Sequence, residues 1–415
     1  MRDLSIYLHI PFCVRKCLYC DFLSFAVPGF QKEEQTGSCG GWPGDHLSGT
    51  GIRPRGCGSI EDTERVKSYV NLLKRQVIDE AENYRDHRVI SVFWGGGTPS
   101  LLETEMVQQL MDVLRQHYTV MPDAEVTIET NPGTVTAQKL RGYITAGINR
   151  ISIGLQSTDD EELKRIGRIH DYRTFLETYR LAREAGFRNI NIDLMAALPG
   201  QSEASYAETL HRVTALAPEH ISAYSLILEE GTPLYERSGD YQFPTEEEER
   251  EMYLLTGRKL ASCGYHRYEI SNYAREGYEC RHNKVYWQRG DYVGFGLGAA
   301  SMVENTRWSA PAQFDAYEAY VMEEERTGMR SSMQPVQILT RKEQMEEFMF
   351  LGLRMMRGVS KETFCRLYGQ SVEEVYGAVL EKLYAQKLLV CEQDAIRLTA
   401  RGIDVSNYVM AEFLF

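Results

Sequence analysis

Three cysteines near the amino terminus have the residue type and spacing of ligands to an iron–sulfur cluster. Cys13, Cys17 and Cys20 are separated by three and two residues and follow directly on a strand-like run, Ser5–Ile10. Three thiolates on one loop can hold three irons of a [4Fe–4S] cluster, which leaves the fourth iron open to a small molecule. A zinc site with His9 as fourth ligand is the alternative, but this spacing differs from the usual zinc knuckle. The spacing therefore predicts a [4Fe–4S] cluster on the three cysteines.

A glycine-rich segment follows the second strand-like run, Val89–Trp94. Residues 95–99 read Gly-Gly-Gly-Thr-Pro. Glycine lets the backbone approach a ligand closely, and its N–H group can donate to that ligand. No Lys-Ser or Lys-Thr pair follows, so the segment does not match a nucleotide-binding P-loop. Because it comes one strand after the cysteines, we expect it to bind the small molecule on the open iron.

The remaining cysteines give weaker signals. The chain has nine cysteines, an odd number, and it is too long for a scaffold held together by disulfides. Cys39 and Cys57 lie in a stretch rich in Gly, Ser and Pro and are expected not to be ligands. Cys263, Cys365 and Cys391 are scattered, and we expect each to be a small buried apolar side chain.

Short β-branched runs alternate with helical stretches through the first 230 residues. The predicted strands are Ser5–Ile10, Val89–Trp94, Glu125–Glu129, Arg150–Leu155, Asn189–Leu194 and His220–Leu228. The predicted helices cover residues 62–84, 103–118, 136–145, 172–186 and 202–216. Such alternation is typical of parallel strands joined by right-handed crossovers. Six strands fit an α/β fold, a partial (β/α)6 TIM-like barrel, whose chemistry lies at the carboxyl ends of the strands.

The chain divides into three predicted regions. Residues 1–230 form the barrel core, with a loop insertion at about 31–60. Residues 231–334 complete the barrel and contain an aromatic, glycine-rich segment after His282. Residues 335–415 have helical apolar spacing at Met345–Met356 and Val372–Gln386, and then a hairpin pattern. This predicts a C-terminal α+β, winged-helix-like domain that acts as a brace, since it is not notably basic.

Composition excludes several classes of protein. The 415 residues carry a formal net charge of −13, so the chain is a poor general partner for nucleic-acid phosphates. No apolar run approaches the ~18 residues of a membrane span. The amino terminus enters a strand-like run at once, without room for a signal peptide. We therefore expect a cytoplasmic protein without a nucleic-acid partner.

Taken together, the motifs resemble those of the radical S-adenosylmethionine (radical SAM) enzymes. The Cys-x3-Cys-x2-Cys loop after the first strand and the Gly-Gly-Gly-Thr-Pro segment after the second carry this resemblance. Further stretches resemble the oxygen-independent coproporphyrinogen III oxidase branch of that superfamily over nearly the whole chain, apart from residues 31–60. They are Tyr-Leu-His-Ile-Pro-Phe-Cys, Ile-Glu-Thr-Asn-Pro, Ser-Ile-Gly-Leu-Gln-Ser, Gly-Arg-Ile-His, Asp-Leu-Met-Ala-Ala-Leu-Pro-Gly-Gln and Gly-Phe-Gly-Leu-Gly-Ala-Ala-Ser.

Within this branch, the chain is more similar to the heme chaperones than to the oxidases. Phe22 occupies the position at which the oxidases carry a further cysteine, and the amino-terminal extension of the oxidases does not precede the first strand. Residues 282–287 match the HNxxYW motif associated with the chaperones. One departure is Ala196-Ala197, where relatives often have Tyr-Gly, although the preceding Asp193 is kept.

The resemblance implies a set of residues that contact S-adenosylmethionine. They are Tyr7, Tyr19, Gly96, Gly97, Thr98, Glu129, Gln156, Arg168 and Asp193. The residue types suit the ligand, because Glu129 and Asp193 can accept from an ammonium or hydroxyls, and Arg168 can pair with a carboxylate. For each residue alone a surface or structural role is the better explanation, but together, one at each successive strand–helix junction, they favour a binding site.

The HNxxYW segment predicts a heme site. An imidazole can ligate heme iron axially, so His282 is the candidate ligand and Cys280 is the alternative. The neighbours that could cover the porphyrin or meet its propionates are Tyr286, Trp287, Arg281 and Lys284. In the alternative interpretation His282 is structural and the aromatic side chains fill the core.

Three functions compete at this point. The first is a heme chaperone that binds heme and passes it to an acceptor protein. Whether that acceptor is associated with a membrane stays open. This function also implies a partner that donates electrons to the cluster. The second is a radical SAM oxidase that decarboxylates coproporphyrinogen III. The third is a structural iron–sulfur or zinc protein, which leaves the S-adenosylmethionine-type residues unexplained. The HNxxYW match and Phe22 favour the chaperone, for which oxidase activity is not expected.

Overall fold

The computed structural model describes residues 1–27, 60–327 and 336–414. Cys39 and Cys57, and residues 31–59 of the predicted insertion, lie outside the described residues.

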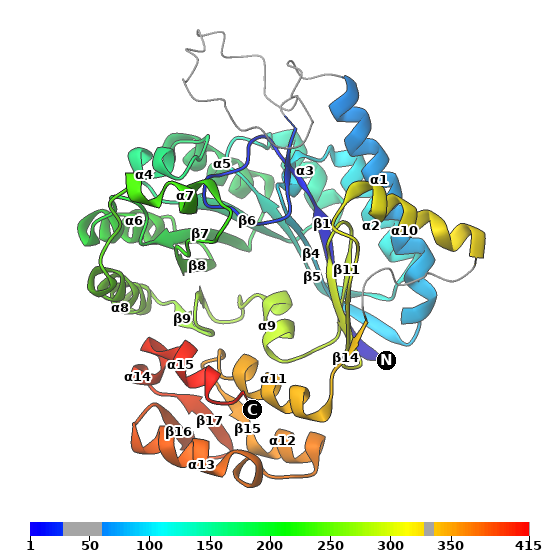
Figure 1. Cartoon of the computed structure of the whole chain (residues 1–415). Helices are drawn as coiled ribbons and strands as arrows, with labels where there is room; N and C mark the ends of the chain where they lie inside the picture. Colours follow the sequence, from blue (N-terminus) through cyan, green and yellow to red (C-terminus); the bar gives the residue numbers. More distant parts are fainter. Residues whose placement is uncertain (28–59, 328–335, 415) are drawn as a thin grey trace.

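The predicted strands form the centre of one twelve-stranded sheet (Figure 1). They are β1 (Arg2–Ile10), β4 (His87–Gly96), β5 (Val120–Thr130), β6 (Arg150–Gln156), β7 (Ile190–Ala196) and β8 (His220–Ser225). Each strand pairs in parallel with the next, so the spatial order follows the chain. This confirms the α/β class and the partial (β/α)6 barrel, and it brings the carboxyl ends of all six strands to one face.

Helices connect these strands, or follow the last of them, and cover the outside of the sheet. In chain order they are α1 (Ile60–Glu80), η2 (Ala81–Tyr84), η3 (Pro99–Leu101), α2 (Thr104–His117), α3 (Ala137–Thr145), α4 (Asp160–Arg165), α5 (Tyr172–Ala185), α6 (Glu203–Ala215), α7 (Pro233–Glu236), η4 (Ser238–Asp240) and α8 (Glu246–Ser262). Local sequence sets their ends. The Asp171 side chain caps the start of α5, and Gly186, at φ +113°, ends it in the left-handed region. All five predicted crossover helices are confirmed.

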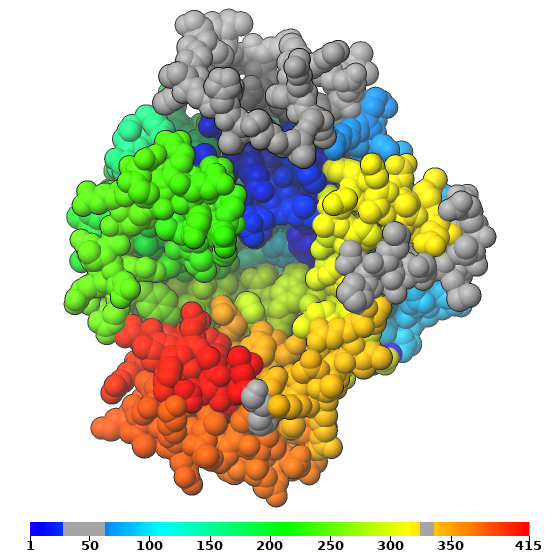
Figure 2. All heavy atoms as spheres, viewed as in Figure 1, coloured from blue at the N-terminus to red at the C-terminus, as the bar shows by residue number. Residues whose placement is uncertain are grey.

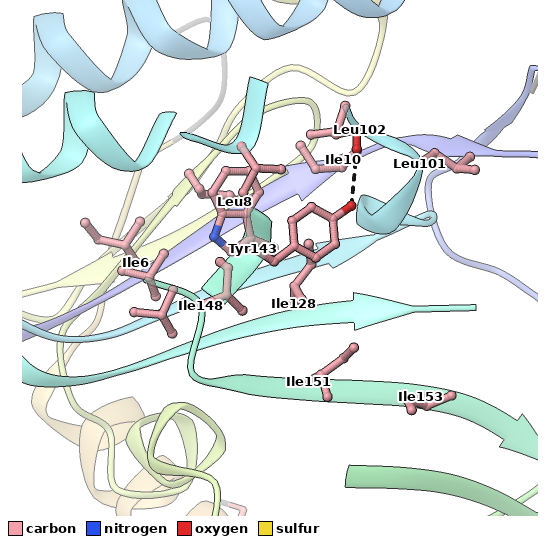
Figure 3. Close-up of a cluster of buried hydrophobic side chains, with 14 of the residues drawn as sticks. Ile6, Leu8, Ile10, Leu101, Leu102, Ile128, Tyr143, Ile148, Ile151 and Ile153 are labelled. Atoms are coloured by element: carbon pink, nitrogen blue, oxygen red, sulfur yellow. Dashed lines mark hydrogen bonds between the residues drawn. The ribbon is translucent and has the colours of Figure 1, made fainter. Parts of the chain in front are cut away.

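The core between sheet and helices is mainly aliphatic, with aromatic side chains packed among the aliphatic ones (Figure 3). Ile6 and Leu8 of β1 are fully buried, as is Ile151 of β6. Burial of one such side chain stabilises the fold by roughly 1.5–3 kcal/mol. Tyr143 of α3 is also buried, and its hydroxyl donates to the carbonyl of Leu102 at 3.2 Å. This core therefore fixes the six strands relative to one another, and with them the face formed by their carboxyl ends.

Further strands extend both edges of the sheet, and the sequence did not predict them. β11 (Tyr292–Phe295) pairs in parallel with β1 and is followed by antiparallel β12 (Ala300–Val303), β13 (Thr306–Ser309) and β14 (Gln337–Ile338). At the other edge lie β10 (Asn272–Ala274) and β9 (His266–Arg267). A two-strand pair, β2 (Phe12–Cys13) and β3 (Phe25–Ala26), brackets the cysteine loop, and α10 (Phe314–Thr327) packs against α1. The added strands are only two to four residues long, too short for a periodic pattern.

A second, separate core lies in the C-terminal region. It joins α11 (Arg341–Gly352), α12 (Lys361–Tyr368), α13 (Val372–Ala385), α14 (Ala400–Asp404), α15 (Ser406–Ala411) and the antiparallel sheet of β15 (Val359–Ser360), β17 (Ala395–Leu398) and β16 (Leu389–Glu392). The predicted hairpin is confirmed. The first predicted helix ends at Gly352, four residues earlier than Met356.

The C-terminal region packs beneath the open barrel, with α9 (Arg281–Trp287) between the two (Figure 1). Glu347 of α11 accepts from Arg289 at 3.0 Å and from Arg307 at 2.8 Å. The Arg289 and Glu347 side chains are only 7% and 9% exposed, so this contact is nearly dry. Across the three described ranges, no helix combines the length and apolarity needed to cross a membrane.

Two expectations about scattered cysteines are wrong. Cys365 and Cys391 are exposed, and Cys263 is half-buried. Cys365 follows the buried Phe364 on α12, and consecutive helical residues point in different directions. Cys391 lies in the second half of β16, where both residues are exposed. The local periodicity, and not the residue type, decides the exposure of these side chains.

Candidate functional site

A pocket opens at the carboxyl ends of the parallel strands and collects most of the predicted site residues. Its lining includes Cys13, Cys17, Tyr19, Cys20, Gly96, Gly97, Thr98, Glu129, Gln156, Arg168 and Asp193. These residues come from β1, β4, β5, β6 and β7 and their following loops, so the fold brings the five junctions together. Figure 2 shows the deep-blue amino-terminal segment in a hollow between the green and yellow segments.

The cysteine loop is fixed at several points. The backbone N–H of Val27 donates to the Cys13 carbonyl at 2.8 Å, and that of Leu18 donates to Ile166 at 3.0 Å. The Thr98 hydroxyl lies 3.4 Å from Cys13 Sγ, and Arg168 Nη1 lies 3.5 Å from Cys17 Sγ. These contacts fix the loop and the Cys13 and Cys17 sulfur atoms, and all three cysteines line the same pocket.

The donor set fits a cluster better than a single metal ion. Within the residues that the structure describes, no three Cys, His, Asp or Glu side chains converge to hold one ion. A [4Fe–4S] cluster instead places each thiolate on a different iron, so the sulfurs need only surround a shared space. His9, the candidate zinc ligand, has both ring nitrogens engaged: Nδ1 contacts the Tyr7 hydroxyl at 3.1 Å and Nε2 contacts the Leu23 carbonyl at 2.8 Å. The zinc alternative is therefore not supported.

The glycine-rich segment packs tightly against β1. A Cβ on Gly97 would lie 2.6 Å from the Phe12 carbonyl oxygen, and one on Gly96 would lie 2.5 Å from the His9 ring. The N–H groups of Gly97 and Thr98 donate to the Ile10 and Phe12 carbonyls at 2.8 and 2.7 Å. We predicted that this segment offers N–H donors to a ligand, but these two N–H groups are used inside the chain. Glycine is needed here because the segment lies so close to the cysteine-bearing strand.

Two half-buried acids, Glu129 and Asp193, make up one part of the pocket lining, its floor. Burial, together with the nearby Asp193, raises the pKa of Glu129 to about 8, although the Gly96 N–H group and Arg150 oppose the shift. Burial also raises the pKa of Asp193, against hydrogen bonds from Asn191 at 2.8 Å and Ser152 at 2.9 Å. A bound cation would offset the cost of ionising both groups. The floor is therefore suited to an ammonium or to hydroxyl donors.

Arg168 supplies one of the positive charges of the pocket, beside Arg15 and Lys16. Its Nη2 donates to the Gly154 carbonyl at 2.6 Å and to Asn131 Oδ1 at 2.7 Å, and its side chain also bonds Tyr19. Its Nε is buried and lacks a partner among the described residues. An orphaned buried donor is uncommon, and a ligand carboxylate would satisfy it.

Two predicted residues differ from the rest. Gln156 is the last residue of β6 and has φ +74°, which turns its side chain into the pocket edge at the cost of backbone strain. Tyr7 is absent from the described pocket lining. It lies behind the wall, where its hydroxyl contacts His9 and its ring would contact a Cβ on Gly95.

Sequence reasoning missed several residues that line the pocket. They are Arg15, Lys16, Phe22, Thr130, Asn131, Ser152 and Gly154. Asn131 belongs to the Ile-Glu-Thr-Asn-Pro stretch, so its motif was available as a signal. Phe22 is 66% exposed at the pocket, an unusual place for a large apolar ring.

The HNxxYW segment forms α9 and lies inside the barrel beneath the pocket. His282 is buried, its Nδ1 contacts the Ser91 hydroxyl at 3.0 Å, and its Nε2 contacts the Tyr286 hydroxyl at 2.9 Å. Its ring stacks on Phe93 with centroids 5.0 Å apart. Burial, reinforced by Arg150, lowers the pKa of His282 to about 3. These contacts favour the interpretation in which His282 is structural; iron ligation by its imidazole stays a prediction and requires one of the two hydrogen bonds to break.

Cys280, the alternative axial ligand, is also enclosed. Its side chain is fully buried, and Sγ donates to Glu125 Oε1 at 3.3 Å. Burial raises the pKa of the thiol to about 12. Because the thiolate is the form that binds metal, this environment disfavours ligation by Cys280.

Comparisons with known proteins show the family of the chain. The radical SAM superfamily model matches residues 7–213, and the HemN C-terminal domain model matches residues 339–405. The heme chaperone HemW of Bacillus subtilis (strain 168) is 33% identical over 413 residues, which are 99% of this chain and 99% of that protein. The heme chaperone HemW of Escherichia coli (strain K12) is 37% identical over 303 residues, 73% of this chain and 71% of that protein.

One solved structure shares the whole fold. It is the coproporphyrinogen III oxidase (HemN) from Escherichia coli, a radical SAM enzyme, with a TM-score of 0.79 and 21% sequence identity. The match covers 100% of this chain and 90% of that chain. At this identity the likeness shows the fold alone.

Proposed function

The chain belongs to the heme chaperone HemW family of radical SAM proteins, and from this we propose that it binds heme and passes it to an acceptor protein. The observation that carries the proposal is the end-to-end similarity, 99% of both chains, to a protein named for this function. The pocket that collects the three cysteines with Arg168 and the two acids supports the radical SAM part of the proposal.

We further propose that Cys13, Cys17 and Cys20 hold a [4Fe–4S] cluster and that S-adenosylmethionine binds beside it. When bound, the cluster supplies electrons to its ligand. The three cysteines line one pocket, where Thr98 donates toward Cys13 and Arg168 donates toward Cys17.

Around the cofactor, the chain's own residues divide the binding work. Arg168 Nε, buried and without a partner among the described residues, would donate to the ligand carboxylate. Glu129 and Asp193 would accept from the ligand's ammonium and ribose hydroxyls, and a bound cation would favour their ionised forms. Tyr7, which lies behind the wall, would act by holding His9 against the Leu23 carbonyl of the cysteine loop.

The oxidase function is the runner-up, and Phe22 weighs against it. An exposed phenyl ring at the pocket occupies the position at which, by resemblance, the oxidases have a further cysteine. The proposed partners are heme, an acceptor protein and an electron donor to the cluster, without nucleic acid.

Two measurements on one preparation test the function. The chain is reconstituted anaerobically with iron and sulfide, and hemin is titrated while the Soret band is followed. The same preparation is then incubated with S-adenosylmethionine, dithionite and coproporphyrinogen III. We expect saturable hemin binding at one equivalent and no protoporphyrinogen. Multiple-turnover decarboxylation would establish the oxidase instead, and failure to bind hemin would refute the chaperone.

A further inference from the structure

A second cavity lies away from the cysteine pocket, where α9 meets the C-terminal region. Its volume is about 440 Å³, and its lining comes from the end of α9, from α11 and the loop that follows it, and from α12 and β17. This volume falls within the range of ~300–1,000 Å³ that small-molecule sites occupy, and such sites are common where two folding units meet. Neither the cluster nor the S-adenosylmethionine assignment uses this space.

Part of the cavity wall is apolar. Trp287 from α9, Phe348 from α11 and the buried Met355 form this part. The Trp287 ring is held on one face by the guanidinium of Arg354, 4.2 Å from the ring centroid. Phe348 packs edge-on against Phe364, with centroids 5.5 Å apart. Both rings are therefore fixed by neighbours, and a planar aromatic ligand matches them best.

Polar groups without partners lie in the same cavity. Trp287 Nε1 is buried and has no hydrogen-bond partner among the described residues. Arg357 is exposed and makes neither a hydrogen bond nor an ion pair within the part of the chain that the structure describes. Arg289, by contrast, is used by Glu347, Tyr368 and Asn305. The exposed guanidinium of Arg357 therefore stays available to a carboxylate on the ligand, whereas the buried Trp287 N–H would become available only if its ring turned.

We propose that this cavity binds the porphyrin, a planar aromatic with carboxylate groups, through its ring faces and its carboxylates. The proposal rests on the proposed heme-chaperone function and adds the place and the mode of binding. The described lining contains no histidine, and both nitrogens of His282 are engaged elsewhere. Binding therefore does not depend on an imidazole bound to the iron, and an iron-free porphyrin should bind about as tightly as hemin.

Titrations with two ligands test the cavity. Hemin and iron-free protoporphyrin IX are each added to the cluster-reconstituted full chain, and tryptophan fluorescence quenching gives the affinity. Arg357→Glu reverses the free cation, and Thr363→Phe fills the cavity while its backbone N–H can still donate to the Ser360 hydroxyl at 3.0 Å. Arg366→Glu is the matched control, an exposed arginine on α12 outside the lining.

We expect both cavity variants to weaken both ligands by about tenfold or more, and the control to bind like the wild type. Arg357 has no partner to lose and Thr363 is only half-buried, so both variants should fold, which thermal melting checks. If the wild type binds hemin and both variants match the control, the cavity is wrong and the chaperone function stands. If hemin binds but protoporphyrin IX does not, iron ligation holds the ligand and the proposal is overturned. If the wild type binds neither, the proposed function fails with it.

Discussion

The carboxylate of Glu125 accepts a hydrogen bond from the backbone N–H of His282 at 3.1 Å, although 157 positions separate the two residues in the chain. It also accepts from the N–H of Arg281 at 3.0 Å and from Cys280 Sγ at 3.3 Å. A helix leaves its first N–H groups without partners inside the helix, and a negative charge there is favourable. Glu125 of β5 therefore fixes the start of α9 to the inside of the barrel and sets the position of the HNxxYW segment.

Replacing Glu125 by Gln should loosen α9. The amide accepts more weakly than the carboxylate, and each charge-assisted hydrogen bond contributes about 1.5–3 kcal/mol. We expect the free energy of unfolding to fall by that order in urea and amide hydrogen exchange at Arg281 and His282 to become faster. Glu105→Gln, on the exposed face of α2, is the control and should change neither. Unchanged exchange at both amides would remove Glu125 from this role.

Replacing Cys13, Cys17 or Cys20 by Ala should abolish the cluster, since two thiolates are too few to hold it. Iron and acid-labile sulfide are measured after anaerobic reconstitution. Cys365→Ala removes an exposed thiol on α12 and should keep the iron content of the wild type. Four irons per chain in Cys17→Ala would show that the assignment is wrong.

Glu129 should make the cofactor-free protein less stable as the pH rises. The pKa of Glu129 is about 8 in the fold, against an ordinary value of 4.5, chiefly because of burial. Between these values the folded chain holds a proton that the unfolded chain has released, so the free energy of unfolding falls as pH rises from about 4.5 to about 8. The Glu129→Gln side chain cannot ionise, so this part of the fall in the free energy of unfolding should be absent from the variant.

Urea unfolding of both proteins at pH 5 and pH 8.5 measures the effect of Glu129. The free energy of unfolding of the variant minus that of the wild type should be larger at pH 8.5 than at pH 5. The increase should exceed about 1.4 kcal/mol, the free energy of one pKa unit. A constant difference between the two proteins would mean that Glu129 is already ionised in the fold.

His282→Ala should lower stability without changing heme binding. The ring fills a buried space and makes two side-chain hydrogen bonds, so its removal should cost about 2–5 kcal/mol of unfolding free energy. The hemin affinity and the Soret maximum should match those of the wild type. His282→Gln, which can keep one hydrogen bond, is the second variant to measure if His282→Ala does not fold. A shifted Soret band in a folded variant would restore His282 as the iron ligand.

Glu347→Gln should weaken the contact between the barrel and the C-terminal region. It leaves the nearly buried guanidinium of Arg289 without its carboxylate, and breaking such a pair costs about 3–5 kcal/mol. Urea unfolding should show an earlier or split transition. Glu362→Gln, on the exposed side of α12, should leave the curve unchanged. An unchanged curve for Glu347→Gln would mean that other contacts dominate this interface.

The sequence was informative where the signal is local. The all-buried run of β6, with Ile151 and Ile153, predicted a central parallel strand, and the cysteine spacing predicted one loop. The partners of His282 were not readable in this way, because Ser91 lies 191 residues away and contacts the ring only once the barrel has formed. The short β11 gave no periodic signal at all.

The same limit applies to the use of polar groups. The N–H groups of the glycine-rich segment after β4 were expected to face a ligand. Those of Gly97 and Thr98 instead donate to the carbonyls of Ile10 and Phe12. Whether a donor faces a ligand or its own chain depends on the register of β1 beside β4, which composition does not fix.

The parallel pairing of β11 with β1 has a consequence for the order of events on the ribosome. β1 is synthesised before β4, with which it can pair after residue 96, but its other neighbour, β11, is not made until residues 292–295. At ~5–20 residues per second, that interval lasts roughly 10–40 s. Through that time the strand leading to the cysteines presents one row of unpaired backbone groups. A nascent chain of this design therefore needs protection from aggregation before it needs its iron.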